Sequence, residues 1–202
     1  MPFQKSVTKW IRHGRQKRAV VQTLTGPMAT AEIHAVIMSE DEPLAPHIRL
    51  RDISFLLREF ISKGLVVCLT SEKIATGKIY ALTEHGRKVA EEVFRIKIDP
   101  IPENADWDLY GWVTRSKNRK KVLIELDRLT EHDEGLAKSQ AQIRKSLGET
   151  HPTHYEHIHR TFMELESREL VERVGVEGRQ IFFRLTETGK KIAKIQQSLC
   201  SY

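Results

Sequence analysis

Two runs of basic residues follow the tryptophans Trp10 and Trp112, and their side chains suit contact with phosphate groups. Lysine and arginine neutralise the charge of a nucleic-acid backbone whatever its base sequence, and an asparagine amide donates to phosphate oxygens. A solvated helical face is the alternative interpretation of such charge runs. The candidate phosphate contacts are Arg12, Arg15, Lys17, Arg18, Arg115, Lys117, Asn118, Arg119, Lys120 and Lys121.

A second group of polar residues, rich in arginine and histidine, accompanies two segments whose apolar residues recur at helical spacing. On a helix that enters a DNA groove, the side chains opposite the buried stripe reach base edges, and arginine pairs with guanine. The same residues also suit the solvated face of an ordinary amphipathic helix. The candidates for base reading are His47, Arg49, Arg51, Ser54, Arg58, His154, His157, His159 and Arg160.

Neither a metal site nor a catalytic site is predicted. Four histidines lie between residues 151 and 159, but structural zinc takes four ligands with help from cysteine or carboxylate, and no such partners are evident. The chain has no nucleophile-elbow, phosphate-loop or HExxH motif, and its carboxylates are scattered among bases. We therefore expect a protein that is not an enzyme and that uses no cofactor.

Composition limits the class of protein further. The 202 residues carry 33 basic and 27 acidic side chains, a formal net charge of +6, which permits nucleic-acid binding where the basic residues cluster. No apolar run is long enough to span a membrane, and the amino terminus does not read as a secretory signal. A cytoplasmic location without a membrane partner is therefore predicted. Two cysteines, Cys68 and Cys200, are too few for a disulfide framework.

The chain contains an internal repeat. LTEHGRKVA, which begins at Leu82, and LTETGKKIA, which begins at Leu185, are identical at six of nine positions and lie 103 residues apart. Preserved order with similar offsets indicates a tandem duplication. The other segments that align are 10–24 with 112–126, and 51–66 with 156–171.

The duplication predicts two domains joined by a short connector. Pro100 and Pro102 cannot continue a helix and favour extended backbone, so the boundary falls around them. The predicted domains are residues 1–97 and 107–202, and residues 98–106 form the linker.

Each repeat predicts three helices, a two-stranded hairpin and a closing helix. The first helix belongs to the basic segments, with Trp10, Tyr110 and Trp112 at its start. Thr83 and Thr186 are expected to cap the closing helices, because a threonine hydroxyl accepts a hydrogen bond from the first turn. In the first repeat, helices are predicted at residues 30–37 and 50–60, the latter with a buried stripe of Leu50, Ile53, Leu57 and Phe60, and strands at 66–69 and 79–82. In the second repeat, helices are predicted at residues 138–147 and 155–165, and strands at 171–174 and 181–185.

Together these segments resemble a known family. SKNRKKVL at 116–123, HIHR at 157–160 and GLVVCLTSEKIATGKIYALTEHGRK at 64–88 are similar to the archaeal-type winged helix transcriptional regulators, which are related to the MarR-like group. The resemblance covers most of both repeats. It implies a mainly helical fold of tandem winged helix-turn-helix domains, and sequence-specific binding of double-stranded DNA, with helix three in the major groove and the hairpin wing along the backbone or minor groove. The wing candidates are Lys73, Lys78 and Arg179.

Two questions stay open on this interpretation. The linked domains act as a pseudo-dimer on related half-sites, or the chain also forms a homodimer through its closing helices. Tandem winged helices serve, in addition, as protein-interaction adaptors in chromosome-segregation or transcription complexes, without base reading. The modest net charge, the insertion DEPLAP at residues 41–46 and Phe55 favour an adaptor, whereas the paired basic segments and HIHR favour DNA.

Overall fold

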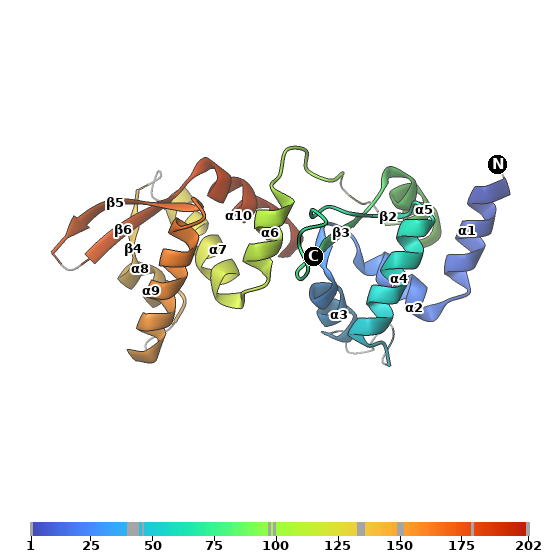
Figure 1. The fold of residues 1–202 in the computed structure, drawn as a ribbon, viewed down its shortest axis with the longest axis horizontal. Helices are drawn as coiled ribbons and strands as arrows, with labels where there is room; N and C mark the ends of the chain where they lie inside the picture. Colours follow the sequence, from blue (N-terminus) through green and yellow to red (C-terminus); the bar gives the residue numbers. More distant parts are fainter. Residues whose placement is uncertain are drawn as a thin grey trace. The chain divides into compact units, whose positions relative to one another are not determined.

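The computed structural model describes residues 2–39, 45, 47–96, 98, 100–132, 136–148, 152–178 and 180–200. These residues are mainly helical and form two small antiparallel sheets of three strands each, so the predicted fold class is confirmed at this level (Figure 1). The chain divides into two compact units, Met1–Gly111 and Trp112–Tyr202, called unit 1 and unit 2 below. Among the described residues, no helix has the length and apolar character needed to cross a bilayer.

Unit 1 begins with a helix whose last residues, from Trp10 on, belong to the repeat, and then runs helix, strand, helix, helix, strand, strand, helix. Its sheet has the strand order β1-β3-β2. A further helix, α6 (Trp107–Thr114), starts in unit 1 and ends in unit 2. The elements of unit 1 are α1 (Pro2–Arg12), α2 (Arg15–Thr23), β1 (Met28–Ala29), α3 (Thr30–Ser39), α4 (Leu50–Ser62), β2 (Val66–Cys68), β3 (Ile79–Leu82) and α5 (Glu84–Phe94).

Unit 2 repeats the same order of elements, and its sheet has the equivalent strand order β4-β6-β5. The repeat in the sequence is therefore also a repeat in the structure. The elements of unit 2 are α7 (Lys117–His132), β4 (Lys138–Ser139), α8 (Gln140–Ser146), α9 (Pro152–Glu166), β5 (Val171–Glu177), β6 (Gln180–Leu185) and α10 (Glu187–Cys200).

The third strand of each sheet was not predicted. Ala29 of β1 pairs with Ile79, and Lys138 of β4 pairs with Phe183, so Lys138 lies in a strand and not in the predicted helix. A strand of two residues shows no alternation of apolar and polar side chains. It exists only because the hairpin offers an unpaired edge to it.

The start of the first helix was predicted wrongly. Trp10 lies in α1 and Trp112 in α6, and each of these helices ends before the next one starts at Arg15 or Lys117. In unit 1 the break falls at Gly14, whose backbone is extended (φ −116°, ψ 108°) at the N-cap of α2. Glycine has a low helix propensity, so the helix is favoured to break at this residue.

The long helices α4 and α9 each bury one side. Ile53, Leu57 and Phe60 are at most 1% exposed, as the apolar spacing predicts. Leu50 is an exception, because it is 49% exposed. Side chains lean towards the amino end of a helix, and no preceding turn lies under a residue in the first position. Phe162 of α9 is fully buried and stacks on Phe183, with ring centres 4.5 Å apart.

The repeated motif beginning at Leu82 and Leu185 starts the closing helices in the same way in both units. The hydroxyl of Thr83 accepts a hydrogen bond from the backbone N–H of Gly86 at 3.0 Å, and Thr186 accepts one from Gly189 at 3.0 Å. Both predicted N-caps are therefore confirmed. The capping threonine is also held by its own backbone, since the N–H of Thr83 donates to the carbonyl oxygen of Leu65 at 3.0 Å.

Candidate nucleic-acid interface

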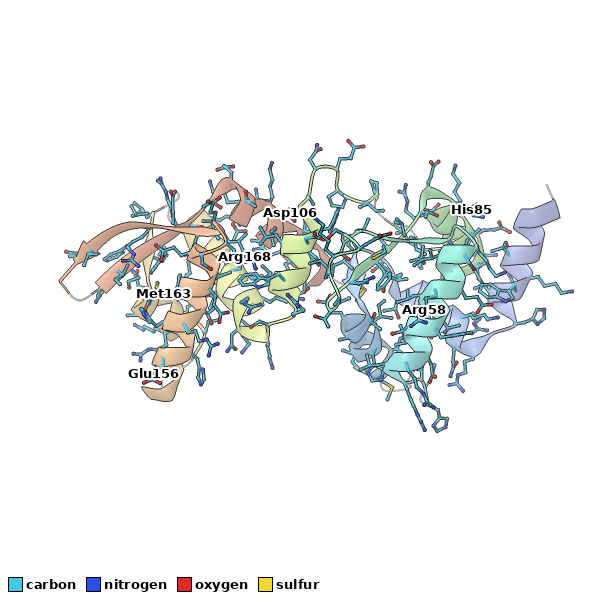
Figure 2. All side chains as sticks on the ribbon, in the orientation of Figure 1. Arg58, His85, Asp106, Glu156, Met163 and Arg168 are labelled. Atoms are coloured by element: carbon cyan, nitrogen blue, oxygen red, sulfur yellow. The ribbon has the colours of Figure 1, made fainter. Side chains whose placement is uncertain are left out.

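The exposed side of α4 carries two arginines with a phenylalanine between them. Arg51, Phe55 and Arg58, called the α4 face below, are spaced by four and three residues, so they project from one side of the helix. The side chain of Arg51 is 76% exposed, Phe55 is 67% exposed and Arg58 is exposed; Arg58 is labelled in Figure 2. The burial of Ile53 and Leu57 on the opposite side holds this face outward.

Three other predicted base-reading residues of unit 1 lie at the edge of this face or before it. His47 and Arg49 are exposed but precede α4, and Arg49 is its N-cap residue. The backbone N–H of Arg49 donates to Asp52 at 2.9 Å, which fixes the entry into the helix. The hydroxyl of Ser54 donates to the carbonyl oxygen of Leu50 at 3.0 Å. Ser54 therefore has only its acceptor capacity left for a ligand.

The corresponding side of α9 has different chemistry. In the gapless alignment Glu156 stands at the position of Arg51, Arg160 at that of Phe55, and Met163 at that of Arg58; Glu156 and Met163 are labelled on α9 in Figure 2. Arg160 is paired with Glu164 one turn later, with 3.0 Å between Nε and Oε1. Unit 2 thus presents one acidic, one paired basic and one apolar residue in place of two arginines and a phenylalanine.

The histidines of HIHR do not share one side of α9. Residues two apart on a helix are rotated by about 200°, so His157 and His159 project in nearly opposite directions. His157 is exposed, whereas His159 is half-buried and lies 3.2 Å from the side-chain amide of the buried Gln140. His159 is therefore less accessible than His157, and its contact with DNA stays a prediction. The side chain of His154 lies outside the described residues.

The tryptophans of the two basic segments are packed between cations. In unit 1 the ammonium of Lys17 lies 3.8 Å from the ring centre of Trp10, and that of Lys63 lies 4.9 Å away. In unit 2 the guanidiniums of Arg119 and Arg168 lie 3.8 and 5.3 Å from Trp112; Arg168 is labelled in Figure 2. Contacts of this kind are attractive through the ring quadrupole. In unit 1 they place the start of α2 beside the carboxyl end of α4, and in unit 2 they place the start of α7 beside the carboxyl end of α9.

Arg119 is held by three interactions. Its Nε lies 2.8 Å from Glu164, its terminal nitrogen donates to the carbonyl oxygen of Trp112 at 2.8 Å, and it stacks on the ring of that residue. Its side chain is only 19% exposed. The pKa of Glu164 is lowered, chiefly by the hydrogen bond from Arg119 and also by Arg160. Arg119 is therefore committed to the fold of unit 2, and its predicted phosphate contact requires this network to open.

The other predicted phosphate contacts stay near the surface. Arg12, Arg15 and Arg18 are exposed at the junction of α1 and α2. In unit 2, Asn118 and Lys121 border a shallow notch that is also lined by Ile158 of α9. The start of α7 and the side of α9 thus meet at one surface. Of the remaining candidates, Arg115, Lys117 and Lys121 are exposed and Lys120 is half-buried.

The loop of the predicted wing in unit 1 forms hydrogen bonds with a residue in the first turn of α6. Asp108 accepts hydrogen bonds from the backbone N–H of Ser71 at 2.7 Å and from its hydroxyl at 2.6 Å, and these bonds lower the pKa of Asp108. A Cβ at Gly111 would lie 2.6 Å from the carbonyl oxygen of Gly77. The hairpin loop is therefore packed against α6.

The two wing candidates of unit 1 differ in exposure, because Lys73 is exposed and Lys78 is half-buried. In unit 2 the hairpin strands are longer, with seven residues in β5 against three in β2, and Val174 and Val176 of β5 are 50% and 64% exposed. Arg179 lies outside the described residues.

Sequence reasoning missed Lys63, Arg168 and Glu164, which complete the two tryptophan clusters. Lys63 and Arg168 occupy equivalent positions in the repeat, so a paired basic residue at the end of helix three was the available signal. No such signal indicated Asp108, because its partner Ser71 is 37 residues away in the chain.

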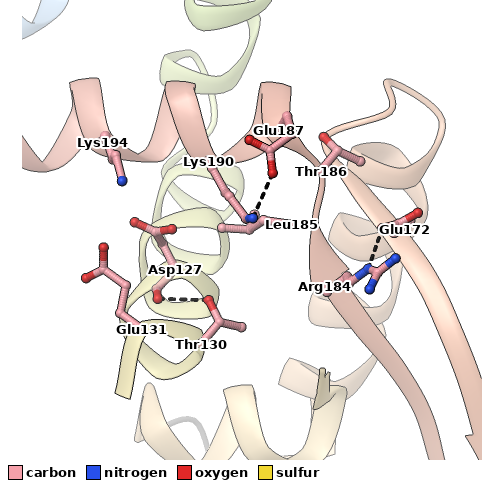
Figure 3. Close-up of a pocket in the computed structure, with 10 residues that line it drawn as sticks. All are labelled: Asp127, Thr130, Glu131, Glu172, Arg184, Leu185, Thr186, Glu187, Lys190 and Lys194. Carbon is pink, nitrogen blue, oxygen red and sulfur yellow. Dashed lines mark hydrogen bonds and ion pairs between the residues drawn. The ribbon is translucent and has the colours of Figure 1, made fainter. Parts of the chain in front are cut away.

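Unit 2 also contains a pocket of about 660 Å³ between α7, α10 and the hairpin strands (Figure 3). Four charged side chains on its wall already pair with each other, Glu187 with Lys190 and Glu172 with Arg184. Asp127 is only 2% exposed, and burial is the main cause of its raised pKa. Among the described residues, no group of three or more metal-ligating side chains is arranged to hold a metal ion.

Replacing Asp127 by asparagine is expected to stabilise unit 2 at neutral pH. Because the pKa of Asp127 is raised in the folded chain, the folded state binds this proton more tightly than the unfolded state does. The free energy of unfolding therefore falls as the pH rises from about 4 through the raised pKa, and the loss persists at neutral pH. Asparagine removes the charge and keeps the size of the side chain.

Urea unfolding of the wild type and Asp127→Asn between pH 4 and 8 measures this effect. The variant should be the more stable protein at pH 7 and should show the smaller pH slope. Glu177→Gln, at an exposed position of β5 that does not contribute to the pKa shift of Asp127, serves as a control. A variant that is less stable than the wild type at pH 7 would mean that Gln197 and Lys194 stabilise the charged form more than burial disfavours it.

Comparisons of the whole chain with known protein families, with curated proteins and with solved structures give no match.

Proposed function

We propose that the protein is a sequence-specific regulator that binds double-stranded DNA through a winged helix-turn-helix domain in each unit. The single observation that carries this proposal is the α4 face, which presents Arg51 and Arg58 opposite a fully buried stripe. An α-helix fits the major groove of B-DNA, where arginine pairs with guanine. The order of helices, with α3 and α4 followed by a hairpin, is the order of a winged helix-turn-helix domain.

The basic residues around α4 suit phosphate contact. His47 and Arg49 lie before the amino end of α4, and Lys63 and Lys17 lie at its carboxyl end beside Trp10. A helix lying in the groove passes a phosphate backbone at both of its ends. The proposal assigns base reading mainly to unit 1 and assigns phosphate contacts to α7 of unit 2, because Arg160 is already paired with Glu164.

An adaptor function is the second candidate. The observations that favour it are the 67% exposure of Phe55 and the packing of the unit 1 hairpin against Asp108. An adaptor of this kind binds a protein surface and has no need of DNA.

Binding of the full chain to random duplex DNA at several salt concentrations distinguishes the two functions. Each phosphate that the protein neutralises releases counterions, so the affinity should fall at least tenfold between 50 and 200 mM salt. The measurement is a fluorescence-anisotropy titration with a labelled duplex. If no binding is detected even at 50 mM salt, the DNA-binding proposal is wrong and the adaptor function takes its place.

A further inference from the structure

Phe55 is an exposed aromatic residue without apolar neighbours on its own side of α4. It is 67% exposed, and none of the residues within about 60° of it around the helix is apolar: these are Arg51, Asp52, Arg58, Glu59 and Ser62. Leu50 and Ile61 are also partly exposed, but at about 100° per residue they lie at least 120° around the helix from Phe55. A surface that docks a protein gathers several apolar residues at its centre, although arginine is also common there. The α4 face has one aromatic residue and no apolar cluster around it.

The major groove offers a matching set of groups. Its base edges carry hydrogen-bonding groups, together with one apolar group, the C5-methyl of thymine, which apolar side chains such as phenylalanine contact. Arginine pairs bidentately with the O6 and N7 acceptors of guanine. The α4 face therefore matches a thymine with guanine-containing base pairs beside it.

The spacing along the helix agrees with this match. With a rise of about 1.5 Å per residue, Phe55 lies about 6 Å from Arg51 and about 4.5 Å from Arg58 along the axis. Stacked base pairs are about 3.4 Å apart, so these separations correspond to one or two base-pair steps. Side chains of this length readily cover the difference.

We propose that Phe55 reads the C5-methyl group of a thymine in the major groove, between guanines read by Arg51 and Arg58. This inference rests on the proposed function and adds to it the base class that α4 selects. In unit 2, Arg160 stands at the position of Phe55 and Glu156 at that of Arg51, so the thymine contact belongs to unit 1 alone.

The test uses the full chain and duplexes that it selects from a random pool. In the tightest duplex each thymine in turn is replaced by deoxyuridine, which removes the methyl group and leaves base pairing unchanged. At one thymine the wild type should lose affinity about fourfold, the effect of burying one methyl-sized group. Phe55→Ala should bind the thymine and deoxyuridine duplexes equally.

Leu50→Ala is the matched control, because it removes an exposed apolar side chain from another side of the same helix. It should keep the wild-type preference for thymine over deoxyuridine. Both positions are partly or largely exposed, so thermal unfolding should show that both variants fold.

The outcomes separate this inference from the proposed function. If the wild type binds DNA in a salt-dependent way but no thymine position responds to deoxyuridine, or if Phe55→Ala keeps the preference, the thymine contact is wrong and DNA binding stands. If no duplex is bound at low salt, both the proposed function and the thymine contact are wrong. Phe55 would then be a candidate contact for a protein partner.

Discussion

Gly86→Ala is expected to destabilise unit 1 strongly. An alanine Cβ at this position would lie 2.0 Å from the carbonyl oxygen of Leu65. That contact is shorter than any contact between non-bonded carbon and oxygen, and the oxygen belongs to backbone and cannot rotate away. It is also held in place by the N–H of Thr83 at 3.0 Å. The closing helix α5 must therefore move away from Leu65, at a cost of about 3 kcal/mol or more.

The duplication supplies a second instance of the same experiment. Gly189 lies in the equivalent position of unit 2, where a Cβ would be 2.0 Å from the carbonyl oxygen of Leu170. Gly189→Ala should therefore destabilise unit 2 by a similar amount. The glycine of the repeated motif is kept in both copies for packing, and it needs no functional explanation.

Thermal unfolding followed by circular dichroism measures both effects. Gly175→Ala in β5 is the control, because nothing lies within 4 Å of a Cβ built there, and it should change the stability little. If Gly86→Ala unfolds at the same temperature as the wild type, the close approach of α5 to the carbonyl oxygen of Leu65 does not limit the stability of unit 1.

The double variant Arg51→Ala, Arg58→Ala is expected to lower the affinity for the selected DNA site about 30-fold or more. A bidentate contact of arginine with guanine contributes about 1 to 3 kcal/mol to discrimination, and this variant removes two of them. Both side chains are exposed, and Arg51 has only an ion pair with Asp52 at 3.7 Å. The fold should therefore be unaffected. Affinity for unrelated duplexes should fall much less, because it rests on phosphate contacts.

Two controls accompany this variant. Lys88→Ala with Lys191→Ala removes the same amount of charge from exposed positions on the closing helices α5 and α10, and should have a small effect on affinity. Arg160→Ala should also lower affinity only slightly, because Arg160 is paired with Glu164 and stands beside Glu156. If Arg160→Ala has the larger effect, unit 2 reads the bases and the assignment to α4 is wrong.

Several elements could be predicted because they depend on residues close together in the chain. The apolar spacing of Ile53, Leu57 and Phe60 predicts a helix with one buried side, and the structure has α4 there. Thr83 caps α5 through a hydrogen bond that spans three residues. Such features depend on residues within a few positions of each other, so they can be predicted from the sequence alone.

Other elements could not be predicted because distant segments create them. The strands β1 and β4 consist of two residues each and exist through pairing with β3 and β6. The break between α1 and α2 is different, because Gly14, a poor helix former, was a local signal that the sequence interpretation did not use. Residues 107–111 were predicted as part of the second domain, and the structure groups them with unit 1, where Tyr110 is 1% exposed.

The sequence by itself determined the duplication, the two long helices and the presence of arginines at positions 51 and 58, since periodicity and identity are properties of the chain. Only the tertiary structure decided which basic residues remain exposed. Arg119 is held against Trp112 and Glu164, and His159 lies against Gln140, because residues far apart in sequence meet there. Whether a charged side chain can reach a ligand depends on such partners, and those partners are set by packing.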